Sequence, residues 1–272
     1  MLEHLAPARR RLVLAVAGAV LLGVVAVATT AVLRSDAPVE PVSQGTQGPV
    51  LLVPGYGGST TSLEVLATAL RTAGRDARVV SPAGSGTEDL RVQAETLDRA
   101  VRAALDETGA PSVDVIGYSA GGVVVRLWVA ELGGDAVTRR VVTLASPHHG
   151  SDLAGLAGDL APDACPVACQ QLVPDSDLLR DLNGDDETPP GPRWVALWTT
   201  DDKTVVPPES GSLEGALDFS VQQVCPGLVV AHPDVPRTPA VIAMVAAALG
   251  RDVPELPGSA VCAATAAGTV SP

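Results

Sequence analysis

From Pro49 onward the chain alternates short apolar runs with longer segments in which apolar residues recur at helical spacing. Strands that are apolar at successive positions are typical of a sheet covered by helices on both faces. The pattern predicts strands at Val50–Val53, Ala77–Ser81, Val113–Ile116, Arg140–Ala145, Trp194–Thr199 and Gly227–Ala231. It predicts helices at Ser62–Ala73, Asp89–Glu107, Gly121–Leu132 and Pro239–Leu249. This order indicates an α/β domain with a mostly parallel central sheet of about six strands flanked by helices.

Two segments lack this alternation. Residues 34–48 carry Pro, Gly, Ser and Gln without apolar periodicity, and we interpret them as a linker. The segment Ser151–Pro192 is rich in Asp, Pro and Gly with scattered leucines, which predicts loops and short helices over the carboxyl edge of the sheet. Ligands of open α/β sheets bind along that edge. The folded domain is therefore expected to span residues 49–272.

The N-terminal residues 1–33 have a different character. The run Arg9–Arg11 precedes an uncharged apolar span, Leu12–Leu33. About 20 apolar residues suffice to cross a bilayer, and the arginines favour a cytoplasmic N-terminus. A cleaved signal peptide has a shorter apolar core of about 7–15 residues, but Ala26–Ala28 could serve as its cleavage site. A signal anchor and a signal peptide both remain open, and either one predicts a domain that is secreted or anchored to the outer side of the membrane.

Composition narrows the class of protein. The chain has 272 residues, of which 46% are apolar and 18% charged, and this predicts a folded domain with a full core. Its net charge of −13 argues against a nucleic acid partner and against electrostatic binding to anionic lipid. A monomer is the default expectation.

The cysteines all follow the apolar N-terminal span; they are Cys165, Cys169, Cys225 and Cys262. An even number in an exported segment predicts two disulfides, with three possible pairings. No metal is expected, because the C-x₃-C pair has no histidine nearby at the spacing of a zinc site.

The stretch VDVIGYSAGGVVVRLW, residues 113–128, places Ser119 in a G-x-S-x-G motif between a predicted strand and a predicted helix. This is the context of a nucleophile elbow, a sharp turn that exposes the serine hydroxyl. Gly117 and Gly121 leave room where a Cβ would collide in such a turn. The same residues could form a Gly-rich helix start with Ser119 as its cap, so the motif alone does not decide the role of the serine.

A serine nucleophile needs a base. His232 follows the predicted strand Gly227–Ala231, so it is expected at the same sheet edge as Ser119. His148 and His149 lie between a proline and a glycine, and we interpret them as a turn that shapes the site. His232 is therefore the predicted base.

The acid of such a triad is expected between the serine and the histidine along the chain. Asp201 and Asp202 directly follow the predicted strand Trp194–Thr199, and a carboxylate there can orient an imidazole. We favour Asp202, because it begins the sequence D-x-x-V-x-P, in which Val205 can anchor the loop in the core. Asp201 remains the alternative.

A Gly-rich turn, VPGYGGS, follows the first predicted strand. Backbone amides in such a turn, together with the amide after the nucleophile, can stabilise an oxyanion. The expected donors are the amides of Tyr56 and Ala120. The turn matches neither common nucleotide-binding glycine motif, so no organic cofactor is expected.

From about Pro49 to Gly250 the chain resembles the α/β-hydrolase superfamily, in particular its small secreted lipases and esterases. The matching pieces are VPGYGG, GYSAG, TLASPHHGS, TTDDKTVVP and VCPGLVVAH, in this order. TLASPHHGS resembles bacterial class 2 lipases, whereas QQLVPDSDLLRDLN and VCPGLVVAH resemble fungal lipase B-type enzymes. Pro54 departs from the many bacterial lipases that have His before the oxyanion glycine, but the fungal relatives also have V-P-G. In these fungal enzymes a cysteine ahead of the catalytic histidine is bonded to one near the C-terminus, which implies Cys225–Cys262 and leaves Cys165–Cys169.

The resemblance implies a carboxylic-ester hydrolase that forms an acyl-enzyme on Ser119, with His232 as base and Asp202 orienting it. The substrate class would be a small-molecule or lipid ester, and no cofactor or metal is needed. Candidate walls of an apolar acyl pocket are Leu153, Leu156, Leu172 and Leu178. Two alternatives remain: an acyltransferase with the same triad, and a non-catalytic binding module on a hydrolase fold.

Overall fold

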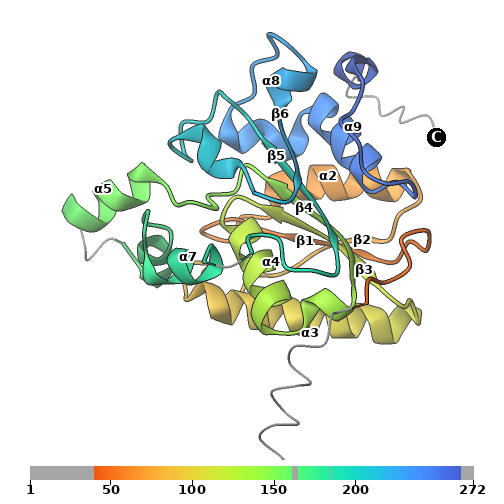
Figure 1. The fold of residues 1–272 in the computed structure, drawn as a ribbon, viewed down its shortest axis with the longest axis horizontal. Coiled ribbons are helices and arrows are strands. Elements are labelled where there is room, and N and C mark those ends of the chain that lie inside the picture. Colours follow the sequence, from red (N-terminus) through yellow and green to blue (C-terminus); the bar gives the residue numbers. More distant parts are fainter. Residues whose placement is uncertain (1–39, 161–164, 185, 265–272) are drawn as a thin grey trace, which may run out of the picture. The chain divides into compact units, whose positions relative to one another are not determined.

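The computed structural model describes residues 40–160, 165–184 and 186–264. At its centre is a six-stranded sheet with the strand order β2-β1-β3-β4-β5-β6 (Figure 1). All neighbouring strands are parallel, so their carboxyl ends lie at one edge of the sheet. The strands are β1 (Val50–Val53), β2 (Ala77–Val79), β3 (Val113–Tyr118), β4 (Thr138–Leu144), β5 (Arg193–Trp198) and β6 (Leu217–Ser220).

Helices cover both faces of the sheet (Figure 1). One face carries α2 (Thr61–Thr72) and α9 (Pro239–Ala248), and the other carries α3 (Leu90–Thr108) and α4 (Ala120–Glu131). Within β1, Val50 and Leu52 pack against the first helix layer, whereas Leu51 and Val53 pack against the second. Successive strand residues face opposite sides, so a strand buried on both faces must be apolar throughout.

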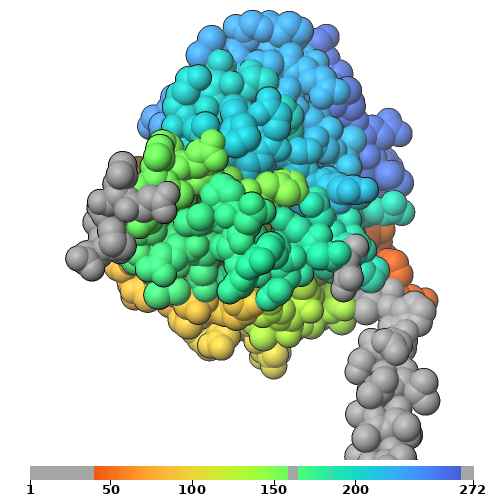
Figure 2. All heavy atoms as spheres, turned by 60° about the vertical axis from the view of Figure 1, so that its left-hand side comes forward, coloured from red at the N-terminus to blue at the C-terminus, as the bar shows by residue number. Residues whose placement is uncertain are grey.

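The segment between β4 and β5 contains α5 (Asp152–Leu160), α6 (Val167–Gln171) and α7 (Asp177–Leu182). Figure 2 shows its green residues at the surface, next to the yellow residues of α3. Leu178 and Leu179 of α7 are buried in the core between the sheet and α3 and α4. The predicted loops and short helices are therefore present.

The remaining short helices are η2 (Gly134–Ala136), η4 (Pro208–Gly211), α8 (Val221–Val224), η5 (His232–Arg237) and η6 (Ser259–Ala263).

The predicted elements match the structure except at the last strand. All four predicted helices and the first five strands are present, with ends that agree to within two residues. The strand predicted at Gly227–Ala231 is wrong, because this segment pairs with no strand of the described ranges and bonds instead to side chains of Thr199 and Asp201. The sixth strand is β6, a four-residue element (LDFS) in which half of the residues are polar, so its apolar pattern is weak.

The predicted signal or anchor, residues 1–33, lies outside the described residues. Within the ranges 40–160, 165–184 and 186–264, no helix has both the length and the apolar character needed to cross a membrane. The last residues of the expected linker contact the domain. Gln47 donates a hydrogen bond to the Leu249 carbonyl at 2.9 Å, and Arg139 donates one to the Gln44 carbonyl at 3.0 Å.

The structure contains the disulfides Cys165–Cys169 and Cys225–Cys262, which is the pairing that the resemblance implied. The first joins Cys165, just ahead of α6, to Cys169 within that helix. The second joins the segment that precedes His232 to η6 near the C-terminus.

Candidate active site

Ser119 forms the turn between β3 and α4, at the carboxyl edge of the sheet. Its backbone has φ 53° and ψ −129°, a conformation that non-glycine residues rarely adopt. The Ser119 amide donates to the Leu144 carbonyl at 2.8 Å, and its carbonyl accepts from the Gly122 amide at 2.9 Å. The hydroxyl makes no capping hydrogen bond to α4. Ser119 therefore lies in a sharp strand-to-helix turn, and its hydroxyl does not cap the helix.

Gly117 and Gly121 allow this turn to approach its neighbours. A Cβ on Gly121 would lie 2.4 Å from the Val53 carbonyl oxygen, and one on Gly117 would lie 2.5 Å from the Gly122 Cα. Both contacts are to backbone atoms, which cannot rotate out of the way.

We expect Gly121→Ala to lower the free energy of unfolding by about 2–3 kcal/mol, because the added methyl group forces β1 or α4 to shift. Gly258→Ala is a matched control, since φ there is −70° and no atom lies within 4 Å of an added Cβ. The control is expected to change stability by less than about 0.5 kcal/mol. Urea unfolding of both variants measures the difference, and equal stabilities would show that the elbow tolerates the side chain.

His232 begins η5, and its imidazole bridges Ser119 and Asp202. Its Nε2 lies 3.0 Å from Ser119 Oγ, and its Nδ1 lies 2.7 Å from Asp202 Oδ2. His232 is only 7% exposed and Asp202 only 3%, so little water competes for these hydrogen bonds. A carboxylate that accepts from Nδ1 leaves Nε2 free to accept the serine proton.

The second oxygen of Asp202 fixes the orientation of the carboxylate. Oδ1 accepts hydrogen bonds from the amides of Thr204 and Val205, both at 2.8 Å. The Val205 side chain is buried, as expected for an anchor of this loop. The carboxylate therefore cannot turn away from His232 without losing two backbone hydrogen bonds.

Asp201 contacts different groups. Its Oδ2 accepts from Gln222 Nε2 at 2.8 Å and from the Val230 amide at 3.0 Å. Of the two candidate acids, the structure thus brings Asp202 to the imidazole of His232 and directs Asp201 to the loop that precedes it.

The turn after β1 lies directly against Ser119. A Cβ on Gly55 would be 2.9 Å from the Ser119 Cβ. Within the described part of the chain, neither the Tyr56 amide nor the Ala120 amide donates a hydrogen bond to another protein group. Ala120 is the first residue of α4, where helix amides lack partners and the helix dipole favours negative charge. Both amides are therefore available to an anionic oxygen near Ser119.

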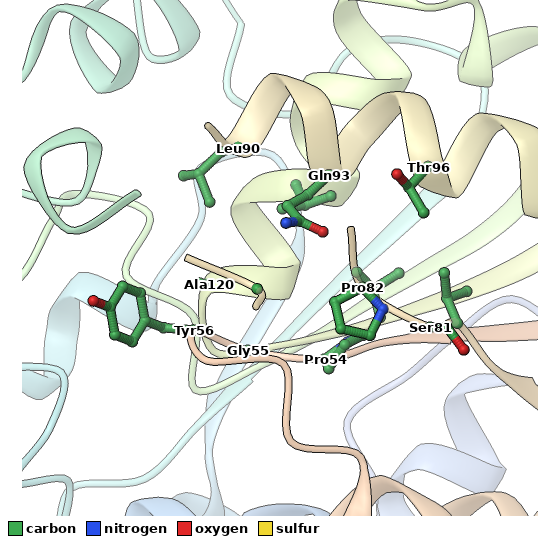
Figure 3. A pocket seen from close by; sticks show the side chains of 13 residues that line it. Pro54, Gly55, Tyr56, Ser81, Pro82, Leu90, Gln93, Thr96 and Ala120 are labelled. Atoms are coloured by element: carbon green, nitrogen blue, oxygen red, sulfur yellow. The ribbon is translucent and has the colours of Figure 1, made fainter. Parts of the chain in front are cut away.

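A small pocket with a cavity volume of about 20 Å³ adjoins this turn, between residues 80–86, α3 and the start of α4 (Figure 3). Gln93 lines it, but its amide group accepts from the Ala83 amide at 2.9 Å and donates to the Ala83 carbonyl at 3.0 Å. The Thr96 hydroxyl donates to the Val92 carbonyl. Gln93 and Thr96 are thus already paired, and most of the other residues that line the pocket are apolar. Its apolar lining includes Pro54, Pro82, Leu90 and Val124.

His148 and His149, which we interpret as a turn that shapes the site, make no hydrogen bond to the Ser119 hydroxyl in the described part of the chain. His148 is fully buried, with Nε2 3.1 Å from the Thr143 hydroxyl, and burial holds its pKa well below the usual range. This imidazole is therefore neutral. His149 Nε2 lies 2.7 Å from the Glu187 carboxylate. Among the described residues, neither imidazole is bonded to Ser119, and both belong to the turn after β4.

The predicted leucine walls do not line the pocket of Figure 3. Leu172 and Leu178 are buried in the core on the side of α3 and α4. Leu153 and Leu156 lie on α5 and are 46% and 54% exposed.

Tyr118 is a site residue that the sequence pattern did not reveal. Its hydroxyl donates to the His232 carbonyl at 3.1 Å, and its ring centroid lies 5.2 Å from that of the imidazole. Burial raises the pKa of Tyr118 well above its usual value, so the phenol stays protonated and remains a donor. The G-x-S-x-G motif contains Tyr118, but the contact of this residue with His232 depends on the fold.

Within the described ranges, no three His, Cys, Asp or Glu side chains come together in a group that could hold a metal ion.

The comparison with protein families gives a match over part of the chain. The family described as the alpha/beta hydrolase fold matches residues 48–163, a range that contains Ser119 but ends before Asp202 and His232. No curated protein matches the chain at a significant level.

Several solved structures are similar. Lipase B of Aspergillus fumigatus has a TM-score of 0.65 and 22% identity over 82% of this chain and 59% of that chain. Lipase BlEst2 of Bacillus licheniformis, in its propeptide form, has a TM-score of 0.50 and 23% identity over 60% of this chain and 38% of that one. The lin2722 gene product of Listeria innocua has a TM-score of 0.56 and 16% identity over 78% and 97% of the two chains. The chain therefore spans less than two thirds of the length of either lipase.

These similarities agree with the parallel sheet and the two helix layers. The chain is thus a protein of the α/β-hydrolase fold.

Proposed function

We propose that this protein is a serine hydrolase that cleaves carboxylic esters outside the cytoplasm. The observation that carries the proposal is the continuous hydrogen-bonded series from Asp202 through His232 to Ser119, with heavy-atom distances of 2.7 and 3.0 Å. At these distances the imidazole can accept a proton from the serine hydroxyl, and the carboxylate can orient the imidazole.

The proposed reaction has two halves. Ser119 Oγ attacks the ester carbonyl carbon while His232 Nε2 takes its proton, and the Tyr56 and Ala120 amides stabilise the oxyanion that forms. His232 then gives that proton to the departing alcohol, and the acyl group remains on Ser119. A water molecule gives a proton to His232 and attacks the acyl carbon. His232 then returns this proton to Ser119 Oγ as the bond from Oγ to the acyl carbon breaks, which releases the carboxylic acid and restores the serine.

The surroundings of Ser119 favour an ester with an apolar acyl part. The pocket beside Gly55 and Ala120 is lined mostly by apolar residues, and two of its polar residues, Gln93 and Thr96, are paired with backbone groups. An apolar acyl group can pack against such a surface without leaving polar groups unpaired. The fold similarity to Aspergillus fumigatus lipase B supports the same substrate class.

Two disulfides support a location in an oxidising compartment. The apolar span that we interpret as a signal peptide or anchor, Leu12–Leu33, supports export as well. We therefore propose that the enzyme works on the outer side of the membrane.

Hydrolysis of p-nitrophenyl esters with short to long acyl chains, run beside emulsified triglyceride, tests this function. Wild-type protein is expected to hydrolyse part of the series, and Ser119→Ala is expected to lower kcat by about 10⁶-fold. Ser43→Ala, at an exposed serine in the segment ahead of β1, is the matched control and should retain full activity.

Two results would contradict the proposal: no hydrolysis of any ester by the wild type, or an unchanged rate in Ser119→Ala. Release of p-nitrophenol only after an alcohol acceptor is added would instead favour an acyltransferase that uses the same residues.

A further inference from the structure

The segment between Cys225 and His232 behaves like a strand without belonging to the sheet. Its side chains alternate, since Val229 is 78% exposed whereas Val230 is only 1% exposed. This alternation is the pattern that predicts a strand. Yet among the described residues no neighbouring strand pairs with its backbone, because the sheet ends at β6.

Side chains take the place of this missing strand. The Val230 amide donates to Asp201 Oδ2 at 3.0 Å, and the Val230 carbonyl accepts from the Thr199 hydroxyl at 2.8 Å. The Leu228 carbonyl accepts from Gln222 Nε2 at 3.0 Å. Buried backbone groups need partners, and these groups find them at the end of β5 and in α8.

Gln222 joins these contacts into one network. Its Nε2 also lies 2.8 Å from Asp201 Oδ2 and 3.0 Å from the Thr199 hydroxyl, so its two N–H groups are shared among these oxygens and the Leu228 carbonyl. Its Oε1 accepts from the Thr200 amide at 3.0 Å. The Asp201 carboxylate therefore has a fixed orientation when it accepts from Val230.

We propose that Asp201 is a positioning residue for His232, acting through the amide of Val230. The inference rests on the proposed function. The two adjacent carboxylates then have complementary roles, because Asp202 orients the imidazole and Asp201 fixes the backbone two residues ahead of it. Tyr118 holds the same histidine through a hydrogen bond to the His232 carbonyl. Without the Asp201 contact, the loop shifts and His232 Nε2 moves out of line with Ser119 Oγ.

Asp201→Ala tests this directly. We expect kcat on a p-nitrophenyl ester to fall by about 10- to 100-fold, because small displacements of catalytic groups have effects of this order. The KM should stay within about twofold, since Asp201 does not line the pocket, and the Val230 amide should exchange its hydrogen faster than in the wild type. Asp201→Asn keeps an acceptor oxygen for Val230 and should keep kcat within about fivefold of the wild type.

Asp76→Ala is the matched control. It removes one carboxylate ahead of β2, where the Asp76 side chain bonds only to Arg78 among the described residues. Neither kcat nor exchange at Val230 should change.

The proposal is overturned if Asp201→Ala keeps the wild-type kcat, or if it loses kcat while Val230 exchange stays slow. If Asp201→Ala does not fold, Thr199→Val is the second variant, because it removes the hydroxyl that donates to the Val230 carbonyl. It should lower kcat about fivefold at unchanged KM. An unchanged kcat would overturn the proposal in the same way. A wild-type protein without esterase activity would refute the proposed function, whereas the exchange of Val230 would still test the contact with Asp201.

Discussion

His232→Ala is expected to lower kcat for ester hydrolysis by about 10⁴- to 10⁶-fold while the protein remains folded. The imidazole is the only group bonded to the Ser119 hydroxyl among the described residues. Without it no base accepts the serine proton, and the hydroxyl at its ordinary pKa is a poor nucleophile. The measurement is kcat on a short-chain p-nitrophenyl ester, with circular dichroism to verify the fold.

His149→Ala is the matched control for this prediction. His149 follows β4 and contacts Glu187, so its removal should change kcat by no more than about threefold. An equal loss in the two variants would mean that the base has been assigned to the wrong histidine.

Asp202→Asn is expected to lower kcat by about 10⁴-fold. Because Oδ1 accepts from the Thr204 and Val205 amides, an asparagine keeps its oxygen at that position. Its amide nitrogen then faces His232 Nδ1, which must become the acceptor. The ring proton moves to Nε2, and Nε2 can no longer accept from Ser119. The variant therefore keeps its shape and loses the required tautomer.

Asp201→Asn makes the same chemical change one residue earlier, and it should keep kcat within about fivefold of the wild type. Measuring both variants on one ester separates the roles of the two carboxylates. If Asp201→Asn lost more activity than Asp202→Asn, the acid would be Asp201 and the assignment of Asp202 would be wrong.

Apolar periodicity predicted the sheet well where it reflects burial on two faces. The run VLLV of β1 is buried at every position. Four successive apolar residues bounded by turn residues are typical of a central strand with both faces buried. The same reasoning failed at Gly227–Ala231. Its apolar residues LVV do not indicate a strand paired within the sheet. Val230 packs into the core, but its backbone bonds to side chains that lie 29 and 31 residues earlier. A local pattern does not distinguish such a segment from a strand.

Chain order predicted which residues meet at the site, because strand ends of a parallel sheet share one edge. It could not separate Asp201 from Asp202 by chemistry. Adjacent residues at a strand end point in different directions, and which one faces His232 depends on how the loop folds. The sequence pattern also missed Tyr118 and Gln222, because their roles depend on contacts between distant residues. Tyr118 bonds to His232, 114 residues later, and Gln222 bonds to Thr199, 23 residues earlier.

Labelling with a fluorophosphonate probe, followed by peptide mapping, tests the central claim most directly. Such probes phosphonylate a serine only when it is activated as a nucleophile. We predict one adduct on Ser119 in the wild-type domain, slow labelling in His232→Ala, and none in Ser119→Ala. An unlabelled wild-type protein, or equal labelling of Ser119→Ala, would contradict the assignment of Ser119 as the nucleophile.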